Sequence, residues 1–385
     1  MGSEQLSGMS LVACFADLED PRMARTREHQ LVDILVIAIC AVVSGAEGWT
    51  DVEAFGVARQ RWFKRFLALP NGIPSHDTFG RVFARLSPSA FEAAFSRWIA
   101  TVTDALGAKE GPEVIAIDGK CLRRSFDRAA AKAPIHLVSA WASHRRLILG
   151  QVRTDAKSNE ITAIPDLLAL LDLHGCIVTL DAMGCQKTIA ADIVERGGDY
   201  VLALKGNQGH LHHDVRQTFD YWQRHDFQGI DPSYHETVEK GHGRLDIRRY
   251  RTLPLPAWMA SEYAAWKGLK SLGMVESERH IGPHVSKETR FYLLSLNSDA
   301  ERLALAVRAH WGIENQVHWV LDVVFHEDNC RLRKDHAPAN FSVLRRIAIN
   351  LLRQENSSKA SLRNKRLRAA WDIRYLFKIL NSRSF

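Results

Sequence analysis

The sequence has no apolar run near its N-terminus that is long enough to cross a lipid bilayer. The longest such run, residues 31–43, contains Asp33 and falls short of the roughly 20 residues that a membrane-spanning helix needs. It predicts a buried helix instead. The opening residues Met1-Gly-Ser-Glu also lack the features of a secretory signal. We therefore expect a cytoplasmic protein with no part in a membrane.

Cysteine pairs, low-complexity segments and clear internal repeats are lacking as well. The six cysteines are scattered without a CxxC pair, and most of them stand in apolar stretches. This spacing argues against a disulfide framework and a zinc site, and it is typical of reduced, packed thiols. With 385 residues, 46% of them hydrophobic, the chain can bury a large core and form two or three domains.

Acidic residues are outnumbered, with 44 Asp and Glu against 51 Lys and Arg and a formal net charge of +7. A positive balance favours a polyanionic partner, although an ordinary basic enzyme can have the same charge. The placement of the charge is more informative, because basic residues cluster toward the C-terminus. The clusters comprise Arg331, Arg333 and Lys334; Arg345, Arg346 and Arg353; and Lys359, Arg363, Lys365, Arg366 and Arg368.

Residues 1–108 predict an all-α N-terminal domain, because apolar residues recur there at helical spacing between turn signals. Ser75 is a suitable N-cap for one helix, and residues 91–106 form another that ends at Gly107.

Beyond residue 113 the apolar residues occur in short runs that are typical of strands. The runs are 114–117, 135–141, 147–152, 176–181 and 200–205, with helical patterns at about 162–173 and 189–196. This order predicts a mixed five-stranded sheet with helices packed on it, an α/β architecture. We assign residues 109–385 to this second domain, with a β-rich insertion at about 208–297 and a basic helical region at about 336–385.

Two of the predicted strands end on an aspartate, Asp118 and Asp181. An Asp-Gly pair such as Asp118-Gly119 is by itself typical of a turn, but the repeated pattern favours a shared site. Glu314 lies on a largely apolar and aromatic face of a later helix, where a solvated acid would be out of place. Three carboxylates at one place would repel one another unless a divalent metal such as Mg²⁺ neutralised them. Alternatives for the third acid are Glu327, Asp328 and Asp322.

Several separate segments of the chain form a recognisable series. They are Ala-Ile-Asp-Gly-Lys at 116–120, Leu-Asp-Ala-Met at 180–183, Leu-Ala-Leu-Lys-Gly-Asn-Gln at 202–208, and the run from His310 to Asp322, with Pro-Ser-His-Asp-Thr at 74–78 before them. In this order they resemble the hallmark motifs of bacterial insertion-sequence transposases of the DDE class, in the H-repeat-associated group. The resemblance covers about residues 11–355. It implies a ribonuclease H-like catalytic domain with a β-rich insertion before the helix that bears Glu314.

The resemblance also implies an activity. Asp118, Asp181 and Glu314 would be catalytic metal ligands for Mg²⁺, or for Mn²⁺ in its place. The metals would support cleavage of double-stranded DNA at the terminal inverted repeats of the element and attack of the freed 3′-hydroxyl on target DNA. A homodimer in a synaptic complex at the bacterial nucleoid is the expected assembly, with the N-terminal helices and the basic C-terminal region holding the element ends.

One departure from related groups concerns the residues around Glu314. Those groups carry a Tyr, an Arg and a Lys where this chain has Val307, His310 and Leu321, so Arg308 or His310 becomes the candidate for the basic role. The predicted DNA-contacting residues are Lys120, Lys205, Asn207, Gln208, Arg244, Arg308, His310, His318, Arg331 and Arg333.

Simpler interpretations of several motifs remain open. Residues 205–208 can be a plain turn and residues 241–244 a plain loop. Trp311 and Trp319 are more often core residues than stacking platforms for bases. The triplet His210, His212 and His213 is better explained as a polar helix face than as a metal cluster.

Two other functions share these residues. A metal-dependent nuclease would cleave DNA without joining it, and a domesticated DNA-binding protein would not catalyse at all. The three acids are intact, which argues against a DNA-binding relic without activity. A strand-transfer assay distinguishes a transposase from a nuclease that does not join DNA.

Overall fold

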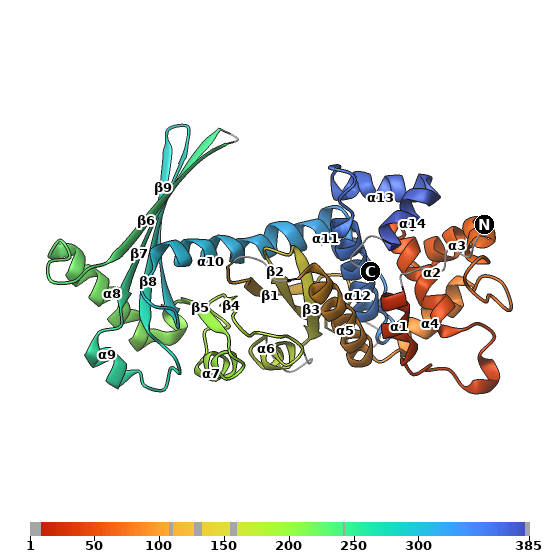
Figure 1. The fold of residues 1–385 in the computed structure, drawn as a ribbon, viewed down its shortest axis with the longest axis horizontal. Helices are drawn as coiled ribbons and strands as arrows, with labels where there is room; N and C mark the ends of the chain where they lie inside the picture. The colour runs from red at the N-terminus through yellow and green to blue at the C-terminus, as the bar shows by residue number, and fades with distance from the viewer. Residues whose placement is uncertain (1–8, 108–110, 127–132, 155–159, 242, 382–385) are drawn as a thin grey trace.

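A computed structural model describes residues 9–107, 111–126, 133–154, 160–241 and 243–381 of the chain. The molecule is elongated, with helices from both termini at one end and long strands projecting at the other (Figure 1). Within the described residues the strands form one nine-stranded sheet in the order β3-β2-β1-β4-β5-β9-β8-β7-β6. None of the helices in the described part of the chain is both long and apolar enough to cross a membrane.

The predicted helical N-terminal region is confirmed. Its helices are α1 Met9–Ala16, α2 Leu31–Val43, α3 Trp49–Phe63, α4 His76–Arg85 and α5 Pro88–Leu106, with a short 3₁₀ turn at Ala24–Thr26. Helix α2 is apolar almost all round and is therefore buried. The Ser75 side chain accepts a hydrogen bond from the Thr78 amide, as an N-cap does, and Ser87 caps α5 in the same way.

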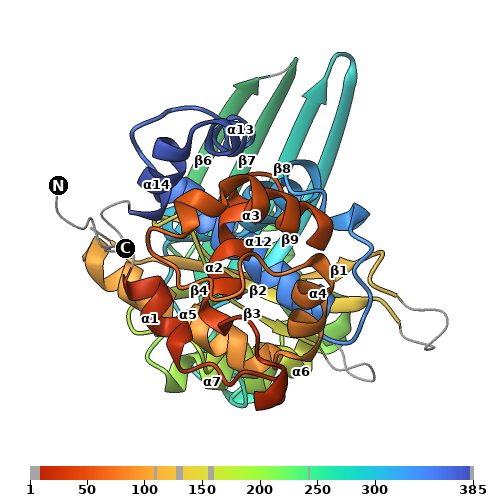
Figure 2. The ribbon, with the colours of Figure 1, turned by 90° about the vertical axis from the view of Figure 1, so that its right-hand side faces the viewer.

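These helices do not have a hydrophobic core of their own. They share one with helix α12, Ala337–Gln354, and with part of the sheet. The Asn340 amide donates hydrogen bonds to the carbonyls of Phe83 and Leu86, at 2.7 and 2.9 Å. Figure 2, which views the molecule from this end, shows α12 running behind α2. The N-terminal region thus packs onto the rest of the chain through α12.

The five predicted strands are all present. They are β1 Val114–Leu122, β2 Ile135–Ala142, β3 Leu147–Arg153, β4 Ile177–Leu180 and β5 Asp199–Leu204, with α6 Glu160–Leu168 and α7 Lys187–Glu195 between them. Strand β1 is antiparallel to β2 and parallel to β4, and β4 is parallel to β5. The sheet is therefore mixed, as predicted, and its central strands are buried.

The predicted number of strands is too small. The insertion contributes α8 Gly209–Arg224, β6 Ser233–Gly241, β7 Arg244–Pro254, α9 Ala257–Glu262, β8 Ser271–Ile281 and β9 His284–Leu294. Because β9 pairs antiparallel with β5, these strands continue the same sheet and do not form a separate layer. Charged residues alternate along their outer parts and form cross-strand ion pairs such as Arg279–Asp246, so apolar periodicity marks only their inner ends.

A long helical stretch crosses the sheet after β9 (Figure 1). It consists of α10 Ala300–Ile313, a π-helical turn Glu314–His318 and α11 Trp319–Val323. A 3₁₀ turn at Glu327–Asn329 leads to α12, and α13 Leu362–Trp371 and α14 Ile373–Leu380 end the described chain. Helix α10 packs against β1, so the helix that bears Glu314 lies over the strand that bears Asp118.

Candidate active site

Strands β1 and β4 bring two aspartates to the same edge of the sheet. Ile117 pairs with Leu180 in the parallel ladder, so Asp118 and Asp181 each follow one member of the same pair. The carboxyl ends of parallel strands meet at one edge. Both side chains line a cavity of about 580 Å³. The side chain of Asp181 also accepts hydrogen bonds from the amides of Met183 and Gly184, at 3.0 and 3.1 Å, which fix the loop after β4.

The turn that an Asp-Gly pair alone would suggest at residues 118–119 does not occur, because β1 continues to Leu122. Gly119 has a different purpose. A Cβ atom at this position would lie 2.0 Å from Oε1 of Glu160, the first residue of α6. A larger residue there would require the Glu160 carboxylate, at the end of a flexible side chain, to move away from the backbone of β1. An Asp-Gly pair alone could not reveal this contact, since Glu160 is distant in the sequence.

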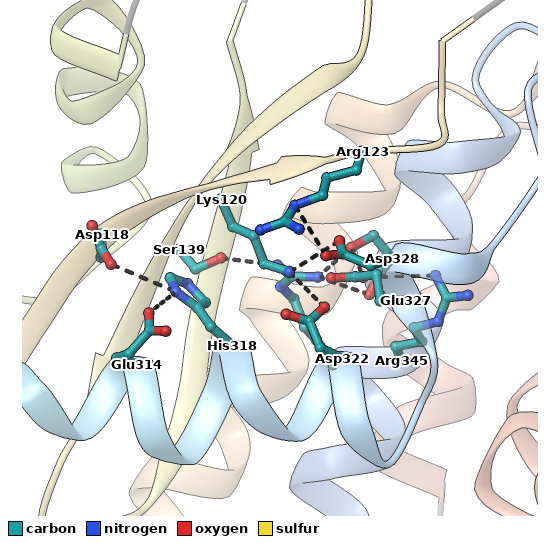
Figure 3. Close-up of polar contacts among 12 residues, drawn as sticks. Asp118, Lys120, Arg123, Ser139, Glu314, His318, Asp322, Glu327, Asp328 and Arg345 are labelled. Atoms are coloured by element: carbon teal, nitrogen blue, oxygen red, sulfur yellow. Dashed lines mark hydrogen bonds and ion pairs between the residues drawn. The ribbon is translucent and has the colours of Figure 1, made fainter.

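Glu314 approaches Asp118 from the helical side and lines the same cavity. His318, one π-turn later, lies between the two acids (Figure 3). Its Nδ1 atom is 3.1 Å from Oε2 of Glu314 and 3.5 Å from Oδ2 of Asp118. The Glu314 side chain is 57% exposed, so the expectation that it faces a dry apolar surface is wrong. It opens instead onto the cavity.

Burial shifts the pKa values of several groups around the cavity. Burial, together with the nearby carboxylates of Asp181, Glu160 and Glu314, raises the pKa of Asp118 to about 7. Burial also lowers the pKa of His318 and of His310, whose Nδ1 atom is 3.0 Å from the hydroxyl of Thr179. Burial therefore disfavours charge on the imidazoles that could balance these acids, and a cation is favoured beside Asp118.

The donor atoms at this place fit a divalent cation. One ligand atom from each of Asp118, Glu314 and His318 lies within 4.8 Å of the others. Asp181 lines the same cavity and adds a further carboxylate. Carboxylate oxygens are preferred by Mg²⁺ and Mn²⁺, and a mixed set with imidazole suits Mn²⁺. Asp118, Glu314 and His318 could therefore hold the ion, whereas Asp181 lines the same cavity but is not part of this close group.

The three alternatives for the third acid are engaged elsewhere, as Figure 3 shows. Glu327 is buried with its carboxylate 3.6 Å from Arg345, 3.5 Å from Arg346 and 2.8 Å from the hydroxyl of Ser342. Asp322 and Asp328 both pair with Lys120, at 2.6 and 3.4 Å. Among the four acids, only Glu314 faces Asp118.

Lys120 was expected to contact DNA, but its side chain is only 8% exposed. Its ammonium group is enclosed by Asp322 and Asp328, so it is not presented to a ligand. The sequence shows that Lys120 follows Asp118 by two residues, but it does not show that Asp322 and Asp328 surround the ammonium group.

Much of the basic C-terminal region is likewise unavailable to DNA. Arg345, Arg346, Lys365 and Arg366 are buried. Arg366 donates hydrogen bonds to the carbonyls of Val324 and Val42, and Lys365 donates to the carbonyl of Leu352. These cations hold helices together. The exposed members of the clusters are Arg331, Lys334, Lys359, Arg363 and Arg368. Arg333 is half-buried and stacks over Phe126, with 4.7 Å from its Cζ to the ring centroid.

The residues after β5 support the loop that carries Asp181. The Asn207 amide donates to the carbonyl of Ala182 at 2.6 Å, and that of Gln208 donates to the carbonyl of Cys185 at 2.9 Å. Lys205 lines the cavity itself. Asn207 and Gln208 were predicted to contact DNA; the structure gives them a supporting position that their spacing from Asp181 did not reveal.

A second cavity of about 490 Å³ adjoins the first along β7, β8, β9 and α10. The two share Glu288, Arg290 and Trp311. Its basic lining residues are Arg244, Arg248, Arg279, Lys287, Arg290 and Arg308. The sequence pointed to Arg244 and Arg308 but not to the other four, because these lie on strands of the insertion that apolar periodicity marks only at their inner ends.

The remaining predictions have mixed outcomes. Trp311 and Trp319 are 45% and 55% exposed, so the core interpretation is wrong for both. Cζ of Arg290 lies 5.1 Å from the ring centroid of Trp311, beside both cavities. The triplet at 210–213 forms no metal cluster among the described residues, and His212 contacts the ring of Phe291. Residue 242 of the segment 241–244 lies outside the described residues.

The fold and the site define an α/β protein with carboxylates gathered where adjacent parallel strands end. Residues 109–351 match the family model described as "Transposase DDE domain", and residues 12–99 match the model "DDE_Tnp_1-associated". The chain therefore belongs to the family of transposases with a DDE domain.

Curated relatives agree with this family. "H repeat-associated putative transposase YhhI" of Escherichia coli K12 is 43% identical, over 94% of this chain and 95% of its own length. "Putative transposase YncI" of E. coli O157:H7 is 40% identical, over 98% of this chain and 96% of its own. A shorter relative, "Inactive transposase YbfQ" of E. coli K12, is 48% identical over 17% of this chain and 79% of its own length.

Proposed function

We propose that this transposase cleaves DNA at the ends of an insertion sequence and joins the freed 3′-hydroxyl to target DNA. Asp118, Asp181 and Glu314 would hold one or two Mg²⁺ or Mn²⁺ ions. Bound ions would activate the attacking oxygen and stabilise the leaving oxygen of a phosphodiester. The observation that carries the proposal is that these three acids, from distant parts of the sequence, line one cavity.

The order and directions of β1 to β5 support a ribonuclease H-like catalytic core. Three antiparallel strands, β3-β2-β1, are followed by the parallel strands β4 and β5. We propose residues 109–385 as the catalytic domain and residues 1–108 as the region that binds element ends. The shared core with α12 means that the two would work as one body.

The chain's own residues would orient the acids in this scheme. The π-turn aims Glu314 toward Asp118, and the amides of Met183 and Gly184 hold Asp181. The ion pair of Lys120 with Asp322 joins the strand to the helix. Held in this way, the acids would need little rearrangement when they bind an ion, and such preorganisation is what phosphoryl transfer requires.

Double-stranded DNA is the proposed partner. The arginines of the second cavity would contact phosphates next to the acids. Arg81 and Arg85 lie on the exposed face of α4 and would contact the terminal inverted repeats, together with Arg331 and Arg333. Because an element has two ends, we also propose that two copies assemble in the synaptic complex.

A strand-transfer assay tests this function. A duplex carrying a terminal inverted repeat with a pre-cut 3′-hydroxyl end is incubated with the protein, Mg²⁺ or Mn²⁺ and a plasmid. We expect covalent joining of the duplex to the plasmid. Cleavage of an uncut end without joining would instead assign a nuclease, and binding without either reaction would assign a DNA-binding protein.

The role of α4 has its own test. Replacing Arg81 and Arg85 by Gln should weaken binding to the inverted-repeat duplex, because two phosphate contacts are lost. Arg216→Gln, an exposed arginine on α8 that lines neither cavity, is the control. Unchanged binding by the α4 variant would refute this role.

A further inference from the structure

His318 is placed as a metal ligand would be. The residue is 5% exposed, and its Nδ1 atom faces the carboxylates of Asp118 and Glu314, which line the cavity (Figure 3). It comes from the π-helical turn that begins with Glu314. Such turns are rare within helices and occur often at functional sites.

The distances fit ligands of one ion. Neighbouring ligand atoms in an octahedral site lie about 3 Å apart when each bond is about 2.1 Å long. The Nδ1 atom is 3.1 Å from the Glu314 oxygen and 3.5 Å from the Asp118 oxygen. A cation centred among these atoms would therefore meet three donors with small adjustments.

The turn is braced so that these distances are maintained. The guanidinium of Arg353 on α12 donates a hydrogen bond to the carbonyl of Gln316, in the middle of the π-turn. It also lies over Trp141, with 4.4 Å from Cζ to the ring centroid. The Asn315 amide donates to the carbonyl of Trp311 at 3.1 Å. Through Arg353, helix α12 thereby fixes the position of His318 relative to strand β1.

The tautomer of His318 is constrained only at Nδ1, which hydrogen-bonds to the Glu314 carboxylate when no ion is bound. Nε2 of His318 is buried and has no hydrogen-bond partner within the described part of the chain. A partner that accepted a proton from Nε2 or donated one to it would fix which nitrogen is protonated. Without such a partner, the proton can reside on Nε2 and leave the Nδ1 lone pair free to bind an ion.

We propose that Nδ1 of His318 binds the divalent cation together with Asp118 and Glu314, and that this nitrogen makes the site prefer Mn²⁺ to Mg²⁺. The inference rests on the proposed metal-dependent function and adds a ligand to it. Mg²⁺ is a hard ion that prefers oxygen donors, whereas imidazole is better tolerated by Mn²⁺ and the later transition metals. The acids alone would accept either ion.

Pulsed electron paramagnetic resonance of the full chain loaded with Mn²⁺ tests this ligand directly. Imidazole nitrogen bound to Mn²⁺ gives a ¹⁴N hyperfine coupling, which we expect in the wild type. His318→Asn should remove the coupling, because its amide can still donate to Glu314 but has no imidazole nitrogen. His310→Asn, at a histidine that lines the cavity but lies outside the close group of ligand atoms, should leave the coupling in place.

Calorimetric titration supplies the second readout. His318→Asn should weaken Mn²⁺ binding by at least about tenfold and Mg²⁺ binding by less, since loss of a nitrogen donor affects Mn²⁺ more. Mn²⁺ binding without a ¹⁴N coupling in the wild type would overturn the role of His318 and leave the proposed function standing. A failure to bind either ion would overturn both.

Discussion

Nζ of Lys120 lies 2.6 Å from Oδ1 of Asp322, and this ion pair ties strand β1 to helix α11. Lys120 is two residues beyond Asp118 on the same face of the strand. Asp322 lies on α11, which continues the helical stretch that begins with α10 and includes Glu314. The pair therefore helps to set the distance between the two catalytic candidates without belonging to the metal site.

Replacing Lys120 by Met should lower the free energy of unfolding by about 1 to 2 kcal/mol, because Asp322 and Asp328 would lose their shared cation in a partly buried place. Urea unfolding measures the change. Lys267→Met, which breaks an exposed pair with Glu195, is the matched control and should have a smaller effect. Equal effects of the two changes would contradict the structural role of Lys120.

Arg353→Met should weaken Mn²⁺ binding by about tenfold, because the side chain would still pack on Trp141 but would no longer hold the π-turn at Gln316. Arg353→Lys keeps a donor and should recover part of the affinity. Isothermal titration provides the measurement. The account of the turn would fail if the Met variant bound Mn²⁺ as the wild type does.

Glu92 makes stability depend on pH. Its carboxylate is buried, accepts a hydrogen bond from the Gln151 amide at 3.2 Å, and has its pKa raised by burial from 4.5 to about 7. Between these values the folded chain holds a proton that the unfolded chain has released, so this group destabilises the fold progressively as pH rises.

Glu92→Gln removes this titration. Its free energy of unfolding, relative to the wild type, should rise by about 1 to 3 kcal/mol as pH increases from 4.5 to about 7. Urea titrations of both proteins at a series of pH values measure the difference. A difference that stays constant over this range would show that Glu92 ionises normally in the folded state.

The second cavity should contribute to the salt dependence of DNA binding. Arg279→Gln removes one basic group from its lining and should lower the slope of log affinity against log salt by about 0.9. Binding titrations with an inverted-repeat duplex at several salt concentrations give the slope. Arg216→Gln should leave it unchanged. An unaltered slope in the Arg279 variant would show that the second cavity does not contact the phosphates of the bound DNA.

The sequence alone located Asp118 and Asp181 because each follows a short apolar run of a buried strand. Such runs can be recognised from the local pattern of apolar residues, without knowledge of the fold. Strand β6 was not found, because exposed charged and polar residues alternate along it with few apolar residues to mark it.

The basic residues show a second limit of sequence reasoning. Arginine is usually found at the surface, yet Arg346 is buried. Glu327, Ser139 and, on its own helix, Ser342 supply its partners. Tertiary partners of this kind cannot be read from spacing. The relation of His318 to Asp118 was missed for the same reason, since it depends on how α10 crosses β1.

The most direct test of the account is cleavage of a duplex carrying the terminal inverted repeat, under single-turnover conditions, by Glu314→Gln. Glu301→Gln, at the exposed start of α10, is the matched control. The account predicts that Glu314→Gln lowers the cleavage rate by at least about a hundredfold while DNA affinity is retained, because an acid that holds the ion is lost. Cleavage by Glu314→Gln at the rate of the control would contradict it.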